Sequence, residues 1–206
     1  MPSAVDFRQT LRRQLRQARR RLSATDQSLA AEALVDTYQA LSSVLNISGE
    51  KRIALYLTND GEISPYLLCE HLWSLGHNIY LPVVKEQSLD FAHYTQQHLD
   101  DDTLWRENRF GIKEPVDVSP KSGFEMDLVF LPLVGFDDQG GRLGMGGGFY
   151  DRTFANKSKQ AKPLLIGLAH DCQQVASLPM ESWDIPLDVI MTPTQLISIT
   201  NHTKTD

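Results

Sequence analysis

The fold of this chain is decided by a hydrophobic run that leads into a glycine-rich loop, Leu128-Val-Phe-Leu-Pro-Leu-Val-Gly-Phe-Asp-Asp-Gln-Gly-Gly-Arg-Leu-Gly-Met-Gly-Gly-Gly-Phe-Tyr-Asp-Arg152. An unbroken apolar run is typical of a strand buried on both faces of a sheet. Six of the 13 glycines lie between positions 140 and 148. The stretch therefore predicts a buried strand over Leu128–Phe136, a glycine loop, and a helix that begins near Phe149.

The glycine loop has the composition of an anion site. Glycine lets the backbone adopt positive φ and approach a ligand closely, and a helix that follows directs its free N–H groups at an anion. The loop lacks the Gly-Lys-Ser/Thr of a P-loop, and Phe149 stands where the dinucleotide fingerprint needs its third glycine. Arg142 could supply a cation. Asp151 could hold Mg²⁺ or merely complement the helix dipole, and a flexible loop is the alternative for the whole segment.

A basic segment lies at residues 8–22, which carry seven arginines and no acidic residue in a chain of net charge −6. Its leucines and Ala18 recur at helical spacing and predict a helix with Asp6 as the N-cap. Four arginines lie beside the apolar stripe, where a guanidinium can reach a phosphate: Arg8, Arg12, Arg16 and Arg19. A solvated basic face and a mitochondrial presequence are the alternatives.

Helical and strand patterns alternate along the rest of the chain, which indicates an α/β sheet covered on both faces. One helix opens at Ser23 and Asp26 and extends to Leu45. Another has Ser64 as its N-cap and Pro65 in its first turn, and it ends before Gly76. Thr95–Pro120 is polar and irregular. The predicted strands are Arg52–Leu57, Ile79–Val84, Leu89–Tyr94, Leu128–Phe136, Leu164–Ala169, Val189–Thr192 and Leu196–Thr200.

Composition is that of a globular protein, with 206 residues, 41% apolar and 22% charged. No apolar run approaches the roughly 20 residues that span a bilayer, and the acidic net charge argues against a protein that coats nucleic acid. Cys69 and Cys172 form no metal motif, so we expect two small buried residues and a cytoplasmic location.

The glycine-rich stretch resembles the signature of the 5-formyltetrahydrofolate cyclo-ligase family, also called methenyltetrahydrofolate synthetases, which is roughly Phe-Asp-x-x-Gly-x-Arg-Leu-Gly-x-Gly-x-Gly-Tyr-Tyr-Asp. Other matching segments follow the family order: Arg8-x-x-x-Arg12, Glu62, Leu81-Pro82-Val83, Gly111-Ile-Lys-Glu-Pro115 and Trp183-Asp-Ile-Pro-Leu-Asp188. The resemblance implies one domain over residues 1–206. It also implies a three-layer α/β sandwich with a mostly parallel central sheet, similar to sugar-phosphate isomerases and CoA transferases.

The resemblance further implies an activity, the conversion of 5-formyltetrahydrofolate to 5,10-methenyltetrahydrofolate with ATP as co-substrate and Mg²⁺ as cofactor. ADP and phosphate would be released after a phosphorylated formyl intermediate. The partners would be these small molecules, without nucleic acid or membrane, and the chain would be a monomer or weak homodimer. A non-catalytic nucleotide- or folate-binding regulator and a sugar-phosphate isomerase that shares only the fold are the alternatives.

Carried over position by position, the resemblance assigns roles to individual residues. Arg142 and Tyr150 would be catalytic, and Asp151 and Asp184 would hold Mg²⁺. The folate site would be lined by Leu57, Glu62, Met145, Gly146, Gly147, Gly148 and Phe149, with Glu62 accepting from the pterin N–H edge. ATP would be bound by Arg8, Gln9, Thr10, Leu11, Arg12, Arg142, Leu143, Gly144, Met145, Gly146, Gly147, Gly148, Phe149 and Tyr150.

Three positions depart from the family pattern. Arg8 replaces a common lysine, which keeps the charge but changes its geometry to a planar fork. Phe149 replaces the first tyrosine of the usual pair and loses a hydroxyl. Trp183 stands where histidine is frequent, and the resemblance assigns it no role.

Overall fold

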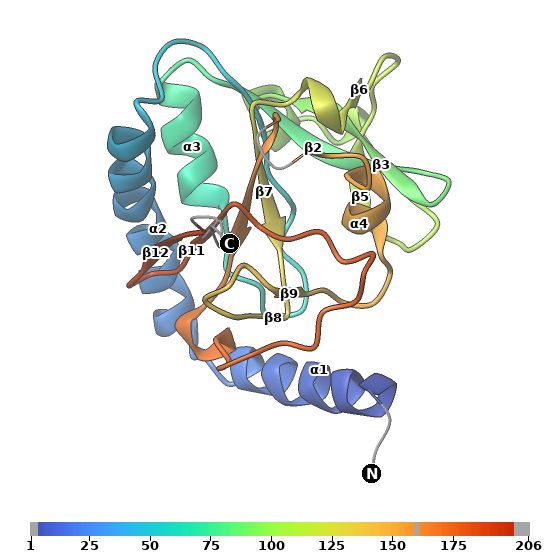
Figure 1. Cartoon of the computed structure of the whole chain (residues 1–206). Helices are drawn as coiled ribbons and strands as arrows, with labels where there is room; N and C mark the ends of the chain where they lie inside the picture. Colours follow the sequence, from blue (N-terminus) through green and yellow to red (C-terminus); the bar gives the residue numbers. More distant parts are fainter. Residues whose placement is uncertain (1–3, 159–160, 200–206) are drawn as a thin grey trace.

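A computed structural model describes residues 4–158 and 161–199, with side chains from Phe7 onward. Within these residues an eight-stranded sheet has the order β12-β11-β10-β7-β1-β2-β3-β6 (Figure 1). The five strands from β11 to β2 are parallel, and the edge strands pair antiparallel. The strands are β1 (Arg52–Ala54), β2 (Asn78–Lys85), β3 (Ser88–Tyr94), β6 (Lys121–Ser122), β7 (Leu128–Pro132), β10 (Leu164–Leu168), β11 (Val189–Met191) and β12 (Leu196–Ser198).

The sheet is covered on both faces. Helices α2 (Ala24–Leu45) and α3 (Tyr66–Ser74) lie on one face, and α4 (Phe149–Thr153) lies on the other (Figure 1). Side chains of β7 alternate between the two apolar cores, Phe130 toward α2 and α3 and Val129 toward α4. The predicted three-layer α/β sandwich with a mostly parallel sheet is therefore confirmed, whereas the single domain over residues 1–206 stays a prediction. Among the described residues, no helix combines the length and the apolar composition that a membrane-spanning segment needs.

The ends of α2 and α3 test the predicted capping residues. Ser23 is the N-cap of α2, where its Oγ accepts from the Asp26 N–H at 3.1 Å while Asp26 accepts from the Ser23 N–H at 3.0 Å. For α3 the prediction was wrong by one residue. Pro65 is the N-cap, because its φ and ψ are not yet helical, and Ser64 Oγ accepts from the Tyr66 N–H at 3.3 Å. Gly76 lies just past the helix with a φ of +78°.

Several predicted strands are shorter than their apolar runs. β1 ends at Ala54, because Tyr56 and Leu57 leave the sheet to line a cavity. The run Leu128–Phe136 forms two strands, since the chain turns after β7 and begins a separate hairpin of β8 (Gly135–Phe136) and β9 (Arg142–Leu143). β10, β11 and β12 each end one or two residues before the predicted boundary; Thr200 lies outside the described residues.

The segment Thr95–Pro120, predicted to be irregular, contains short regular elements. They are two 3-10 helices and a small antiparallel pair, η1 (Gln96–Leu99), η2 (Asp102–Leu104), β4 (Trp105–Glu107) and β5 (Lys113–Pro115). Another 3-10 turn, η3 (Gly123–Glu125), precedes β7, and η4 (Asp171–Gln173) follows β10. Elements of two to four residues carry too little periodicity to be read from a single sequence.

Helix α1 (Ala4–Arg20) lies across the end of the molecule where β7 and β10 terminate (Figure 1). It begins at Ala4, so Asp6 lies inside the helix and the prediction of an N-cap there was wrong. Leu15 is buried and packs against Gly135 of β8. A Cβ on Gly135 would lie 2.4 Å from Leu15 Cδ1, which is closer than two carbon atoms can approach. A larger residue at position 135 would therefore displace Leu15 from this contact.

We predict that Gly135→Ala lowers the free energy of unfolding by about 1–3 kcal/mol, because the added methyl group displaces Leu15. Urea denaturation measures the loss. In a Leu15→Ala background, where the space is free, Gly135→Ala should cost much less. Equal losses in both backgrounds would show that the contact with Leu15 does not limit this position.

Candidate active site

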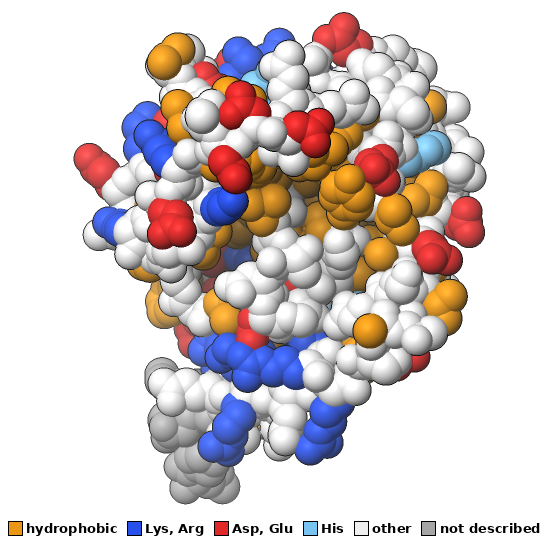
Figure 2. Space-filling view, turned by 180° about the vertical axis from the view of Figure 1, so that it is seen from behind, with side chains coloured by type: hydrophobic (Ala, Val, Ile, Leu, Met, Phe, Trp, Pro, Cys, Tyr) orange, Lys and Arg blue, Asp and Glu red, His pale blue; other side chains and the backbone are white. Residues whose placement is uncertain are grey.

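A cavity of about 1170 Å³ opens where the central strands β1 and β7 end. Figure 2 shows it as a hollow with hydrophobic side chains in its walls and a band of basic side chains below it, at the α1 end of the molecule. Its volume lies above the range of about 300–1,000 Å³ usual for a site that holds one small ligand. In an open α/β sheet, ligands bind beyond the carboxyl ends of the strands, where this cavity lies.

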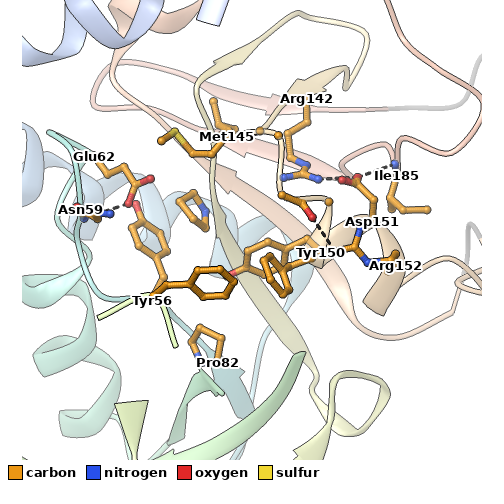
Figure 3. Close-up of a pocket in the computed structure, with 18 of the residues that line it drawn as sticks. Tyr56, Asn59, Glu62, Pro82, Arg142, Met145, Tyr150, Asp151, Arg152 and Ile185 are labelled. Atoms are coloured by element: carbon orange, nitrogen blue, oxygen red, sulfur yellow. Dashed lines mark hydrogen bonds and ion pairs between the residues drawn. The ribbon is translucent and has the colours of Figure 1, made fainter. Parts of the chain in front are cut away.

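The cavity has one apolar half and one charged half. The apolar half is walled by Tyr56, Leu57, Leu81 and Pro82, with the polar groups of Asn59 and Glu62 at its end. The charged half contains the glycine loop with Arg8, Arg12, Arg142, Asp151 and Asp184. In Figure 3, Asn59 and Glu62 lie on one side, Arg142 and Asp151 lie on the other, and Met145 and Tyr150 lie between them. The cavity can therefore hold a flat apolar ligand beside an anionic one.

The glycine loop runs from β9 to α4. Gly146 has a φ of +102° and Gly148 a φ of +65°, conformations that side-chain-bearing residues rarely adopt. Arg12 Nε donates to the Gly144 carbonyl at 2.8 Å and fixes the loop to α1. The helix begins at Phe149 as predicted, but it has only five residues and the loop follows a hairpin instead of the buried strand itself. Loop amides and arginines, more than a helix dipole, make this end attractive to an anion.

Arg142 and Asp151 form a partly buried ion pair beside this loop. Arg142 Nη2 donates to Asp151 Oδ1 at 2.6 Å, and the same oxygen accepts from the backbone N–H of Ile185 at 3.2 Å (Figure 3). The guanidinium also lies 5.8 Å from the centre of the Tyr150 ring. The structure therefore brings together two residues that the sequence predicted to act at one site.

A second ion pair connects α1 to the carboxyl-terminal part of the chain. Arg8 donates twice to the Asp184 carboxylate, at 2.6 and 3.2 Å, and once to the Pro179 carbonyl at 2.9 Å. Burial opposes ionisation of Asp184, but the hydrogen bonds from Arg8 hold the pKa of its carboxyl below the ordinary value. Arg8 and Arg12 thus face the cavity, and the alternative of a solvated basic face is wrong for them.

Glu62 is the buried acid of the apolar half, with 8% of its surface exposed. Its Oε2 accepts from the Asn59 N–H at 3.1 Å, and its Oε1 lies 3.7 Å from Arg19. Burial raises the pKa of Glu62 to about 7, although the charge of Arg19 acts in the opposite direction. Burial, with the charge of Glu62 added, also raises the pKa of the Tyr56 and Tyr150 hydroxyls. Both phenols therefore stay protonated at neutral pH.

Comparison with known proteins identifies the family. Residues 4–193 match the model of the 5-formyltetrahydrofolate cyclo-ligase family, a match that includes every part of the cavity. The chain belongs to this family. The 5-formyltetrahydrofolate cyclo-ligase of Haemophilus influenzae is 43% identical over 188 residues, which cover 87% of this chain and 94% of that protein. The cyclo-ligase of Escherichia coli K12 is 43% identical over 148 residues, 70% of this chain and 79% of that protein.

Solved structures agree with this assignment. The 5,10-methenyltetrahydrofolate synthetase of Aquifex aeolicus has a TM-score of 0.75 at 26% identity, over 97% of this chain and 99% of that one. A synthetase from Mycoplasma pneumoniae, at 23% identity, shares the fold with a TM-score of 0.69 over 90% of this chain and 98% of that one. The predictions of a cyclo-ligase family member, of an enzyme and of its fold class are confirmed.

Most residues carried over from the cyclo-ligase family line the cavity: Arg8, Arg12, Leu57, Glu62, Arg142, Gly144, Met145, Gly146, Gly147, Gly148, Phe149, Tyr150, Asp151 and Asp184. Gln9 lies on a neighbouring groove beside Arg12 and Met145. Thr10, Leu11 and Leu143 line neither space; Thr10 is exposed, and Leu143 is buried in the β8–β9 hairpin. The ligand contacts of all these residues stay predictions.

Sequence reasoning missed several residues of this cyclo-ligase site. Tyr56 and Asn59 lie in the segment after β1, whose first residues had the pattern of a continued strand. Asp60, which accepts hydrogen bonds from Arg16 and Arg19, was not singled out. An Asp-Gly pair after a buried strand is a turn signal that could have directed attention to it.

The two cysteines differ from each other. Cys69 is buried as expected, and burial raises the pKa of its thiol to about 12, so the thiolate that reacts is suppressed at neutral pH. Cys172 is exposed, and the expectation that it is buried was wrong. Cys172 lies in the short turn η4, in which the next residue, Gln173, is the buried one.

We predict that Glu62→Gln stabilises the chain at high pH. The pKa of Glu62 in the folded chain is about 7, and its ordinary value is 4.5. Between pH 4.5 and pH 7, Glu62 is therefore mostly protonated in the folded chain and mostly ionised in the unfolded chain. The cost of burying the carboxylate is thus absent at low pH and complete above pH 7. The free energy of unfolding of the variant, relative to the unmodified chain, should rise by roughly 2 kcal/mol between pH 5 and 8.

Urea denaturation at each pH measures this difference. Glu107→Gln, at an exposed position, is the matched control for the loss of one carboxylate. Parallel stability curves for Glu62→Gln and the unmodified chain would contradict the assignment of a costly buried carboxylate.

Proposed function

We propose that this chain closes 5-formyltetrahydrofolate to 5,10-methenyltetrahydrofolate at the expense of ATP, with release of ADP and phosphate. The observation that carries the proposal is the division of one cavity between an apolar half that ends at Glu62 and a cationic half built on the glycine loop. A folate ring and a triphosphate require these two environments side by side. Membership in the cyclo-ligase family supports the same reaction.

The apolar half suits the reduced pterin. Tyr56, Leu81 and Pro82 provide flat apolar walls, and the Glu62 carboxylate can accept from the N–H groups at the pterin edge. Glu62 is held in place by the Asn59 N–H at 3.1 Å. A ring bound here would direct its formyl group toward Met145 and the glycine loop, which lie between the two halves (Figure 3).

The charged half suits the phosphates of ATP. Four arginines reach it, Arg8, Arg12, Arg142 and Arg152, and each is already fixed by a carboxylate or a carbonyl. The amides of Gly144–Gly148 add donors without adding bulk. Preset donors stabilise developing negative charge without reorganising during the reaction, which is how phosphoryl transfer is catalysed.

The proposed chemistry has two steps. The formyl oxygen attacks the γ-phosphorus and ADP leaves, so a poor leaving group becomes a phosphate ester. The anilino nitrogen then attacks the formyl carbon, the C–O bond breaks, and the phosphate leaves with the proton that the nitrogen loses. We assign to Arg142 the stabilisation of charge on the transferred group and to the protonated Tyr150 hydroxyl a hydrogen bond to it.

The carboxylates of the charged half fit Mg²⁺. Within the described residues no group of three or more His, Cys, Asp or Glu could hold a metal, so an all-protein cage is absent there. Mg²⁺ bound with a nucleotide needs only one or two carboxylates, because phosphates and water supply the other ligands. Asp151 and Asp184 qualify, and the bond from the Ile185 N–H to Asp151 keeps the two segments together. Mg²⁺ would neutralise charge on the phosphate oxygens.

The two other hypotheses differ from this one in turnover. A regulator would bind nucleotide or folate without consuming either, and a sugar-phosphate isomerase would ignore ATP. The cytoplasmic location, the monomer or weak homodimer, and the absence of nucleic-acid and membrane partners stay predictions from the sequence.

The decisive experiment follows product and ADP together. Purified chain is mixed with 5-formyltetrahydrofolate, ATP and Mg²⁺, and the absorbance of the methenyl product is recorded beside the release of ADP. We expect one ADP for each product molecule and no product without ATP. ADP release without folate, or product without ATP, would reject the proposal.

We predict that Arg142→Ala lowers kcat about 10²–10³-fold, the range for loss of one preset donor to a transition-state charge. The same absorbance assay measures it. Arg52→Ala is the control, because Arg52 lies at the opposite end of β1 and its side chain pairs with Glu125. A kcat near that of the unmodified chain would remove Arg142 from catalysis.

We predict that Asp151→Asn raises the Mg²⁺ concentration needed for half-maximal rate about tenfold, since a neutral amide holds the ion less well than a carboxylate. Mg²⁺ is titrated at fixed ATP. Asp138→Asn, an exposed position in the same glycine-rich stretch, is the control. An unchanged titration would exclude Asp151 from the metal site.

A further inference from the structure

Arg19, on the last turn of α1, is a fully buried arginine that does not line the cavity. Its guanidinium donates from three nitrogens. Nε donates to the Asp60 carbonyl at 2.8 Å, Nη1 to the Leu133 carbonyl at 3.0 Å, and Nη2 to the Asp60 carboxylate at 2.8 Å. The rigid five-donor fork of arginine suits this arrangement, and no other side chain offers it.

The partners of Arg19 belong to the walls of both halves of the cavity. Asp60 lies in the segment that presents Asn59 and Glu62, and Leu133 follows β7. Nη2 also lies 3.8 Å from the sulfur of Met145 in the glycine loop and 3.7 Å from Glu62 Oε1. One buried side chain therefore contacts the loop proposed to bind folate and the loop proposed to bind phosphate.

Asp60 is the carboxylate that balances this charge. It also pairs with Arg16, at 2.7 Å, and with Arg20, so three guanidiniums of α1 converge on it. Burial opposes its ionisation, but these hydrogen bonds hold the pKa of Asp60 well below its usual range. Asp60 has a φ of +54°, which side-chain-bearing residues adopt only when their surroundings fix it.

A buried ion pair contributes little net free energy to folding. The cost of taking both charges out of water often equals or exceeds their attraction, and an apolar pair of the same volume would stabilise the fold as well. What the charged fork adds is a fixed position for each acceptor. Helix α1 carries Arg8 and Arg12 to the charged half of the cavity, where the nucleotide is proposed to bind. The contacts of Arg19 therefore connect α1 to the segment that contains Asn59, Asp60 and Glu62, here called the Glu62 loop.

We propose that Arg19, with Asp60, is a positioning residue that fixes the Glu62 loop against the glycine loop, so that the pterin edge and the formyl oxygen are aligned together. The inference rests on the cyclo-ligase activity proposed above. Arg19 touches neither ligand in this account and acts through Glu62 and Met145.

The charge of Arg19 gives the proposal a signature that a purely structural role lacks. Glu62 is faced by Tyr56, by Asp60 and the Asn59 N–H of its own loop, by Tyr150 of α4, and by Arg19 of α1. The buried His170 lies near Arg19 and Gly61, and burial together with the charge of Arg19 lowers the pKa of His170. Arg19 is the cation in this set and favours the carboxylate. Without Arg19 the pKa of Glu62 rises. Folate binding needs the Glu62 carboxylate as an acceptor, so the KM for folate increases when the pH is lowered far enough to protonate it. In a variant without the charge of Arg19, this increase should begin at a higher pH.

The test compares Arg19→Met, Arg19→Lys and the control Arg16→Met in steady-state kinetics from pH 6 to 9. Arg16 shares Asp60, but its side chain is 35% exposed. For Arg19→Met we expect the KM for 5-formyltetrahydrofolate to rise about tenfold while the KM for ATP changes less than about threefold. In this variant, the pH below which the KM for 5-formyltetrahydrofolate increases should be higher than in the unmodified chain. Arg19→Lys should keep the profile of the unmodified chain but show a raised KM, because the charge remains and the fork is lost.

Two outcomes would overturn the proposal: equal increases in both KM values with an unshifted pH profile, or kinetics of Arg19→Met that match Arg16→Met. If Arg19→Met fails to fold, Arg19→Lys decides, and an unchanged folate KM in that variant overturns the positioning role. The thermal stabilisation given by 5-formyltetrahydrofolate alone is measured for each chain. Absence of product with the unmodified chain would reject the cyclo-ligase activity, while the difference in stabilisation would still test Arg19.

Discussion

The structure depends on placing several positive charges close together at the end of an acidic protein. Arginines this near to one another repel, and each one inside the fold loses contact with water. The chain meets this constraint by pairing inward-facing guanidiniums with carboxylates: Arg8 with Asp184, Arg142 with Asp151, and Arg19 with Asp60. The positive charge is thereby held in fixed positions before any ligand arrives.

The parallel sheet supplies the rigid frame for these pairs. β1 and β7 are neighbours whose chain ends diverge, one toward the Glu62 loop and the other toward the β8–β9 hairpin and the glycine loop. The space between these two exits becomes the cavity. The apolar cores on both faces fix the strands, so the loops that carry function can depart from regular structure without loss of the fold.

Local features of the sequence predicted much of this architecture. Ser23 and Asp26 form a capping box within four residues, so the local sequence was enough to identify the start of α2. The glycines near position 146 permit positive φ by themselves, so the loop could also be predicted from its own residues. The Arg8–Asp184 pair joins residues 176 positions apart, and no local sequence pattern predicts it. Arg19 stood in a row of similar arginines, and only the packing of α1 separates this buried side chain from the exposed ones such as Arg13 and Arg21.

Helix α1 attaches to the rest of the chain mostly through polar bonds, since Leu15 is its one buried apolar side chain between positions 7 and 20. Ion pairs are screened by dissolved salt far more than apolar contacts are. Dissolved salt should therefore weaken the attachment of the helix most at its more exposed pairs, such as Arg16 with Asp60, and least at the buried Arg19. A nucleotide bound between Arg8 and the glycine loop would add contacts that favour the docked helix, and release of the products would remove that contribution.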